Sequence, residues 1–294
     1  MTNVLKGRCF SKQVSNPKKT TKRLGVWWFL NCCLWLPLSS LAGETAPRFV
    51  SLTLCSDRLL MALARPAQIA AMSPFSTQPQ SMLGQINTDK PVVRPRLSDL
   101  LPYADATIFL NEKFYPQLLA RLKKLGFRVV GINDNPQTPD ELFALVQQLA
   151  ALTGNADKAQ ALLAQIQTTE ATLRRQTRAQ APRSALALTE NGLLKTTLPQ
   201  HQVLFDLLNL YPVDGLAKAA PQISAEQLLL ANPQVLLTFS FSTAYSQGSQ
   251  WLQHPALTTM MQGRVQAHTA AKYTFCFDHG VWQGAADLMP QLQQ

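Results

Sequence analysis

Acidic residues are absent from the first 43 positions of this 294-residue chain, and the first one is Glu44. Seven of the 27 Lys and Arg residues lie in that segment, which leaves 20 basic against 17 acidic residues over the rest of the chain. The formal charge of +10 would suggest a nucleic-acid partner, but the remainder is nearly balanced and has no basic run that could track phosphates. We therefore expect no nucleic acid among the partners.

The sequence also lacks an apolar run long enough for a typical membrane span, which needs about twenty residues. Its longest such run, LGVWWFLNCCLWLPL at 24–38, follows a basic stretch and precedes the small residues SSLAG. This order is typical of a secretory signal peptide. We interpret residues 1–43 as an export signal, which predicts a periplasmic location. The alternative is an uncleaved anchor, but Asn31 and Pro37 weaken a spanning helix.

Cysteine is scarce once the signal is set aside. Cys9, Cys32 and Cys33 leave with it, and only Cys55 and Cys276 remain. The exported compartment permits disulfides. The pair could be bridged, both free and buried, or placed at a shared site, and the sequence does not choose among these.

Histidine is also sparse, with four residues and no His-rich loop. Zinc or manganese sites need three or four clustered His or carboxylate ligands, so we expect no metal-ion site. His279 and Asp278 lie in a loop at the predicted mouth of a cleft, where the imidazole could be an axial ligand of haem. Ser56, Asp278 and His279 could also belong to an exported α/β hydrolase, but no G-x-S-x-G motif supports one. We expect no catalytic residues.

Apolar runs and helical stripes alternate along the mature chain and predict an α/β protein with mostly parallel sheets. The alternation occurs twice, on either side of a helical segment. In the first half, Ala106–Leu110 is a predicted strand and Ser56 a predicted helix cap. In the second half, strands are predicted at Ser184–Leu188, Val235–Phe239 and Tyr273–Phe277. The predicted parts are a signal peptide (1–43), an N-terminal α/β lobe (47–137), a helical bridge (138–179) and a C-terminal α/β lobe (180–294).

The bridge begins with TPDE at 138–141, a capping box in which Thr138 caps the helix and Glu141 reaches back. Gly154 interrupts the pattern, and Asn155 can cap a second helix that runs to Thr177. At 1.5 Å per residue, that helix is about 35 Å long, enough to cross from one lobe to the other.

Three segments carry a resemblance to a known family. RFVSLTLCSDRLLMALARPAQIAAMS at 48–73, LSDLLPYADATIFLNEKFYPQLLARLKKLGFRVVGIND at 97–134 and ISAEQLLLANPQVLLTF at 223–239 resemble periplasmic-binding proteins for iron–siderophore complexes, haem and cobalamin. The resemblance implies two Rossmann-like lobes joined by a long rigid helix, with the ligand cleft between them. It also implies a monomeric, non-enzymatic carrier that serves an ABC permease and its ATPase at the inner membrane.

The ligand implied is a metal chelate or corrinoid carried as cargo, and no permanently bound cofactor is expected. In the cobalamin branch an acidic residue on each lobe docks onto the permease, and Asp99 and Glu226 are the matching residues here. Both could equally be helix-start acids that favour the helix dipole. A ligand sensor that uses the same fold without transport remains a further alternative.

Loops that follow the carboxyl ends of parallel strands line the ligand crevice in such sheets. Aromatic rings there offer a large contact area to flat ligands, and polar groups orient them. Each such residue could instead belong to the core or to a solvated turn. The ligand-binding candidates are Cys55, Phe75, Asn111, Glu190, Asn191, Phe241, Tyr245, Asp278, His279 and Trp282.

Overall fold

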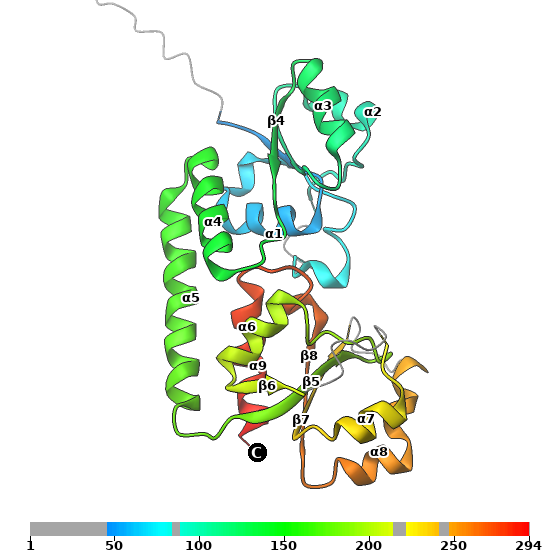
Figure 1. Ribbon diagram of the computed structural model, residues 1–294. Coiled ribbons are helices and arrows are strands. Elements are labelled where there is room, and N and C mark those ends of the chain that lie inside the picture. The colour runs from blue at the N-terminus through cyan, green and yellow to red at the C-terminus, as the bar shows by residue number, and fades with distance from the viewer. Residues whose placement is uncertain (1–45, 84–88, 214–221, 241–246, 294) are drawn as a thin grey trace, which may run out of the picture. The chain divides into compact units, whose positions relative to one another are not determined.

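The computed structural model describes residues 46–83, 89–213, 222–240 and 247–293, which form two parallel four-stranded sheets (Figure 1). The predicted signal peptide, Phe241 and Tyr245 lie outside these residues. The first sheet has the order β2-β1-β3-β4 and the second has the order β6-β5-β7-β8. The strands are β1 (Phe49–Ser51), β2 (Ile69–Ala71), β3 (Thr107–Asn111), β4 (Arg128–Ile132), β5 (Arg183–Thr189), β6 (Leu210–Pro212), β7 (Val235–Ser240) and β8 (Val265–Ala270).

The same strand order in both halves confirms the predicted repeat of one α/β pattern. We call residues 46–134, which contain the first sheet, the N-terminal lobe, and residues 183–293, which contain the second, the C-terminal lobe. The central strands are almost completely buried, as expected when helices cover both faces of a parallel sheet. The helices are α1 (Leu54–Leu63), α2 (Leu97–Leu100), α3 (Pro116–Lys124), α6 (Pro199–Leu207), α7 (Ala225–Ala231), α8 (Pro255–Met260) and α9 (Gly280–Leu292).

Two helices, α4 (Pro139–Thr153) and α5 (Ala156–Thr177), connect the lobes. Thr138 caps α4 as predicted, accepting the N–H of Glu141 at 3.2 Å, whereas the Glu141 carboxylate accepts the N–H of Gln137 rather than that of Thr138. Helix α5 has 22 residues, which corresponds to about 33 Å. It contacts α1 in the N-terminal lobe and α6 and α9 in the C-terminal lobe (Figure 1), so the predicted lobe-spanning helix is confirmed.

One hydrophobic cluster extends through both lobes. It contains Phe49 and Phe109 of the first sheet, Ile166 of α5, and Phe205 and Trp282 of the C-terminal lobe. A continuous close-packed core resists relative displacement of its parts. The core and α5 together therefore make a stiff connection between the sheets.

The predicted positions of one strand and of one helix cap are wrong. The last strand is β8 rather than Tyr273–Phe277, and those residues form the segment that leads into α9. Strand β8 lies at the sheet edge and alternates in burial, so it lacks a continuous apolar run. Within 273–277, Cys276 and Phe277 are buried in the segment before α9, whereas Phe275 is exposed. At the first turn of α1, the N-cap is Thr53 and not Ser56, because the helix begins at Leu54.

None of the helices described is long and apolar enough to cross a membrane.

Candidate functional site

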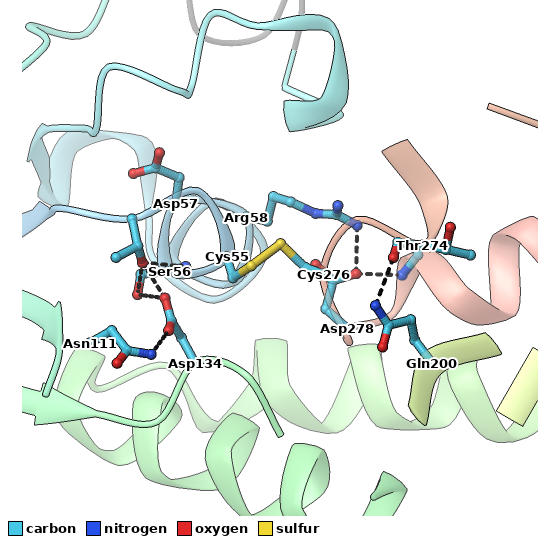
Figure 2. The surroundings of a disulfide bond; sticks show 12 residues. Cys55, Ser56, Asp57, Arg58, Asn111, Asp134, Gln200, Thr274, Cys276 and Asp278 are labelled. Atoms are coloured by element: carbon cyan, nitrogen blue, oxygen red, sulfur yellow. Dashed lines mark hydrogen bonds and ion pairs between the residues drawn. A yellow bond between two sulfur atoms is a disulfide. The ribbon is translucent and has the colours of Figure 1, made fainter. Parts of the chain in front are cut away.

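The loops at the carboxyl edges of the two sheets contact each other through a disulfide bond. Cys55 lies in the first turn of α1, which follows β1, and it is bonded to Cys276, which follows β8 (Figure 2). The two Cα atoms are 5.6 Å apart, although 221 positions separate the residues in sequence. Of the three arrangements that the sequence allowed, the structure has the bridged one. Cys55 therefore has no free thiol to offer a ligand, and its prediction as a ligand contact stays a prediction.

A buried ion pair lies beside the disulfide (Figure 2). Arg58 of α1 donates to the Asp278 carboxylate at 2.6 Å and to the carbonyl oxygen of Lys272 at 2.7 Å. Both charged side chains are 1% exposed. Asp278 also accepts the N–H of Gly280 at 2.8 Å, and a Cβ atom at Gly280 would clash with the guanidinium group. Asp278, selected as a ligand contact, instead holds the two lobes together, and its partner Arg58 was missed.

A second buried polar network closes the carboxyl edge of the first sheet. The Asp134 carboxylate, which follows β4, accepts hydrogen bonds from Thr53, from Ser56 at 2.8 Å and from the Asn111 amide. The Asn111 oxygen in turn accepts the N–H of Lys113 at 2.9 Å. Asn111 is 1% exposed, so it fixes a turn rather than facing a ligand. Because Ser56 donates to Asp134 and Asp278 pairs with Arg58, the geometry does not assemble the triad that the hydrolase alternative requires.

Asp57 of the same region is fully buried, and its carboxylate accepts the backbone N–H of Ser73 at 3.0 Å and the Ser73 hydroxyl. Burial raises the pKa of Asp57 from its ordinary 3.8 to about 7, and the hydrogen bonds from Ser73 only partly oppose this rise. Between these two pH values the folded protein holds a proton that the unfolded chain releases. Stability from this group is therefore fully present below about pH 4 and is lost as the pH rises through 7.

Replacing Asp57 with Asn is expected to remove this pH dependence, since an amide does not titrate there. The free energy of unfolding of the wild type, measured relative to that of Asp57→Asn, should fall by on the order of 4 kcal/mol between pH 4 and pH 8. Urea denaturation of both proteins at several pH values measures the difference. If the free energies of unfolding of the two proteins change by the same amount between pH 4 and pH 8, the assignment of a raised pKa to Asp57 is contradicted.

A pocket of about 120 Å³ lies at the carboxyl edge of the second sheet. Its lining includes Thr189 of β5, Phe239 of β7 and Phe275, which follows β8. Lys195 and His201 complete its polar wall. The segment Ala271–Tyr273, next to Phe275, contacts the N-terminal lobe, so this edge of the second sheet faces the loops of the first. The pocket thus lies where a doubly wound sheet binds its ligands.

His201 is the unusual residue in this pocket. It is 2% exposed, its ring packs edge-on against Phe239 at 4.7 Å between centroids, and neither ring nitrogen has a hydrogen-bond partner among the described residues. Burial, with a smaller effect from the positive charge of Lys195, lowers the pKa of His201 to about 3. A signal for this burial is present in the sequence, because His201, Leu204 and Phe205 share one face of α6 and predict that the imidazole is buried.

Phe75, Glu190 and Asn191 are further predicted binding residues within the described part of the chain. Phe75, 44% exposed, follows β2 and offers its ring to the surface, as Phe275 does in the other lobe. Glu190 and Asn191 form the turn after β5, where the Glu190 carbonyl oxygen accepts the indole N–H of Trp251 at 2.9 Å. Their prediction as ligand contacts stays a prediction.

Trp282 is in the core, which corrects its selection as a cleft residue. Its side chain is 1% exposed, its indole N–H donates to Glu170 at 3.2 Å, and its ring lies 6.2 Å from that of Phe143. His279 is half-buried and lines a separate pocket of about 270 Å³ between α1 and α9, near Arg58. Burial lowers the pKa of His279, and its Nδ1 atom has no partner within the described residues.

The two docking candidates lie near the starts of short helices. Glu226 is exposed in the first turn of α7, and its pKa is lowered, first by a hydrogen bond from Ser224. Asp99 is half-buried in α2 and accepts the Ser98 hydroxyl at 2.9 Å. No group of three or more His, Cys, Asp or Glu residues that could hold a metal ion occurs within the described part of the chain.

The sequence of the chain was compared with those of known proteins and protein families. The family model described as "Periplasmic binding protein" matches residues 107–261, more than half of the 294-residue chain. No curated protein matches the sequence.

Several solved structures share the fold. The periplasmic haem binding protein HutB of Vibrio cholerae is 20% identical, with a TM-score of 0.65 and coverage of 85% of this chain and 100% of that one. The periplasmic vitamin B12 binding protein BtuF of Vibrio cholerae is 19% identical, with a TM-score of 0.62 and coverage of 84% and 97%. A periplasmic haem binding protein from Pseudomonas aeruginosa is 15% identical, with a TM-score of 0.63 and coverage of 83% and 92%. At these identities, the likeness concerns the fold alone.

Proposed function

This chain belongs to the periplasmic binding protein family, and from that premise we propose that it is the extracytoplasmic substrate-binding protein of an ABC importer. It captures a metal chelate, either a ferric siderophore or haem, or cobalamin, and delivers it to the membrane permease. The family and its structural neighbours are binding proteins and not enzymes. The protein accordingly performs no chemistry on its cargo.

The observation that carries this proposal is the pocket of Lys195, His201 and Phe275 at the carboxyl edge of the second sheet, which faces the loops of the first. An exposed ring from each lobe, Phe75 and Phe275, supplies apolar contact area, and the polar groups inside the pocket orient the ligand. Solved structures of the same fold are named for haem and vitamin B12, both of which contain a large macrocycle.

Delivery requires surfaces that the permease recognises. We assign this role to Glu226 and Asp99, one acidic residue from each lobe, which dock onto basic residues of the permease while its ATPase drives transport. Residues 1–43 export the chain to the periplasm, where it acts as a monomer.

A thermal-shift panel tests the proposal with purified protein expressed as the full chain. A ligand at 100 times its dissociation constant stabilises the folded state by about 2.7 kcal/mol. For a chain of this size, that corresponds to an increase in melting temperature of about 5–10 °C. We expect at least one of haemin, cyanocobalamin, ferrichrome and ferric citrate to produce it. If none of them shifts the melting temperature at millimolar concentration, the assignment to chelate or corrinoid transport fails.

A further inference from the structure

The pocket at the carboxyl edge of the second sheet contains a hydrogen-bonding group without a partner. His201 is 2% exposed, and neither Nδ1 nor Nε2 makes a hydrogen bond to a described residue. Burying a polar group unpaired costs free energy, and native proteins contain few such groups. Since burial keeps the imidazole neutral, it carries one N–H donor and one lone pair.

A positive charge lies in the same pocket. Lys195 is half-buried, and no ion pair joins it to an acid among the described residues. No Asp or Glu occurs among the described residues that line the pocket. A partly desolvated ammonium group without a counter-charge attracts an anion more strongly than one in water does.

The size of the pocket limits what it takes. A volume of about 120 Å³ holds a group of a few heavy atoms, because one water molecule occupies about 30 Å³ of the liquid. Sites that enclose a whole small molecule measure about 300–1,000 Å³. Two of its lining residues are joined by a hydrogen bond, in which the Gln200 amide donates to the Thr274 carbonyl oxygen at 3.1 Å (Figure 2). The pocket therefore takes one arm of a larger ligand.

We propose that this pocket binds a carboxylate arm of the transported ligand, with Lys195 as the ion-pair partner and His201 as a neutral N–H donor. This inference rests on the proposed transport function and narrows the cargo to carboxylate-bearing chelates or corrinoids. The exposed ring of Phe275 lies at the mouth, where it contacts the body of the ligand next to its carboxylate arm.

Paired probes that differ only in the carboxylate test the inference by isothermal titration calorimetry. The pairs are haemin with its dimethyl ester, and the monocarboxylic acid of cyanocobalamin with cyanocobalamin itself. The protein should accept the macrocycle of one of the two pairs. Within that pair, we expect the acid to bind at least about tenfold more tightly than the neutral probe, as a hydrogen bond to a charged group implies.

Two substitutions locate that preference in the pocket. Lys195→Met should lower the affinity for the acid about tenfold or more and leave the neutral probe almost unchanged. His201→Phe should lower the affinity for the acid about fivefold. The same variant should raise the melting temperature of the free protein by about 2–4 °C, because it removes two unpaired nitrogens and keeps the ring against Phe239. Lys124→Met is the matched control, since Lys124 is exposed in the last turn of α3, outside the pocket.

The outcomes separate this inference from the proposed function. Equal affinity of the wild type for acid and neutral probe overturns the carboxylate assignment and leaves the transport function standing. An equal loss for both probes in His201→Phe also overturns it, because the imidazole would then contact the body of the ligand. If no probe of either pair binds and the thermal-shift panel is also negative, the proposed function fails and this inference fails with it.

Discussion

Replacing Asp278 by Ala is expected to lower the free energy of unfolding by about 3–5 kcal/mol, because the substitution leaves the guanidinium group of Arg58 buried and unpaired. The two side chains are each 1% exposed and join the lobes at 2.6 Å. A charge without a partner in such a site loses its attraction and keeps its desolvation cost. Urea denaturation at pH 7, monitored by tryptophan fluorescence, measures the change.

Two further variants show whether burial is the cause. Arg48 and Asp105 form an exposed ion pair at 2.9 Å, so Asp105→Ala should cost less than about 1 kcal/mol. The double variant Arg58→Met with Asp278→Leu should recover most of the stability lost in Asp278→Ala, since apolar residues of similar volume need no counter-charge. Equal effects of Asp278→Ala and Asp105→Ala would show that the pair is solvated and not part of a desolvated contact between the lobes.

The sequence predicted the architecture well because local signals are strong in this chain. Near-continuous apolar runs mark the central strands β3, β5 and β7, and Thr138, Gly154 and Asn155 mark the helix ends of the bridge. Strands β6 and β8 were missed or misplaced, since each lies at a sheet edge, where burial on one side is enough and no apolar run is required.

The candidate site was harder to predict, because its geometry depends on contacts between distant segments. Arg58 and Asp278 are separated by 220 positions, and nothing within either segment indicates the pairing. Trp282 and Asn111 were assigned to the cleft from their place after strands, but a strand end does not say whether a side chain points outward or is buried among its neighbours. His201 was not selected, because the sequence places it at the start of a predicted helix and offers no second histidine at metal-ligand spacing.

The disulfide between the lobes is expected to have a comparably large effect. Replacing both Cys55 and Cys276 by Ala should lower the free energy of unfolding by about 2–5 kcal/mol, near the upper end because the bond closes a loop of 221 positions. Guanidinium denaturation of the wild type with and without dithiothreitol should show the same loss, and the double variant should not respond to the reductant.

Denaturation curves of the wild type that coincide with and without reductant would contradict this expectation.

The disulfide also restricts the motion of one lobe relative to the other. It joins the carboxyl edges of the two sheets directly beside the buried ion pair, while α5 and the shared core connect the lobes along their length. Two separate attachments remove the freedom of one lobe to swing about the other. Small-angle scattering should therefore give the oxidised wild type the same radius of gyration with and without ligand. A ligand-dependent decrease in the radius of gyration of the oxidised wild type would contradict this expectation.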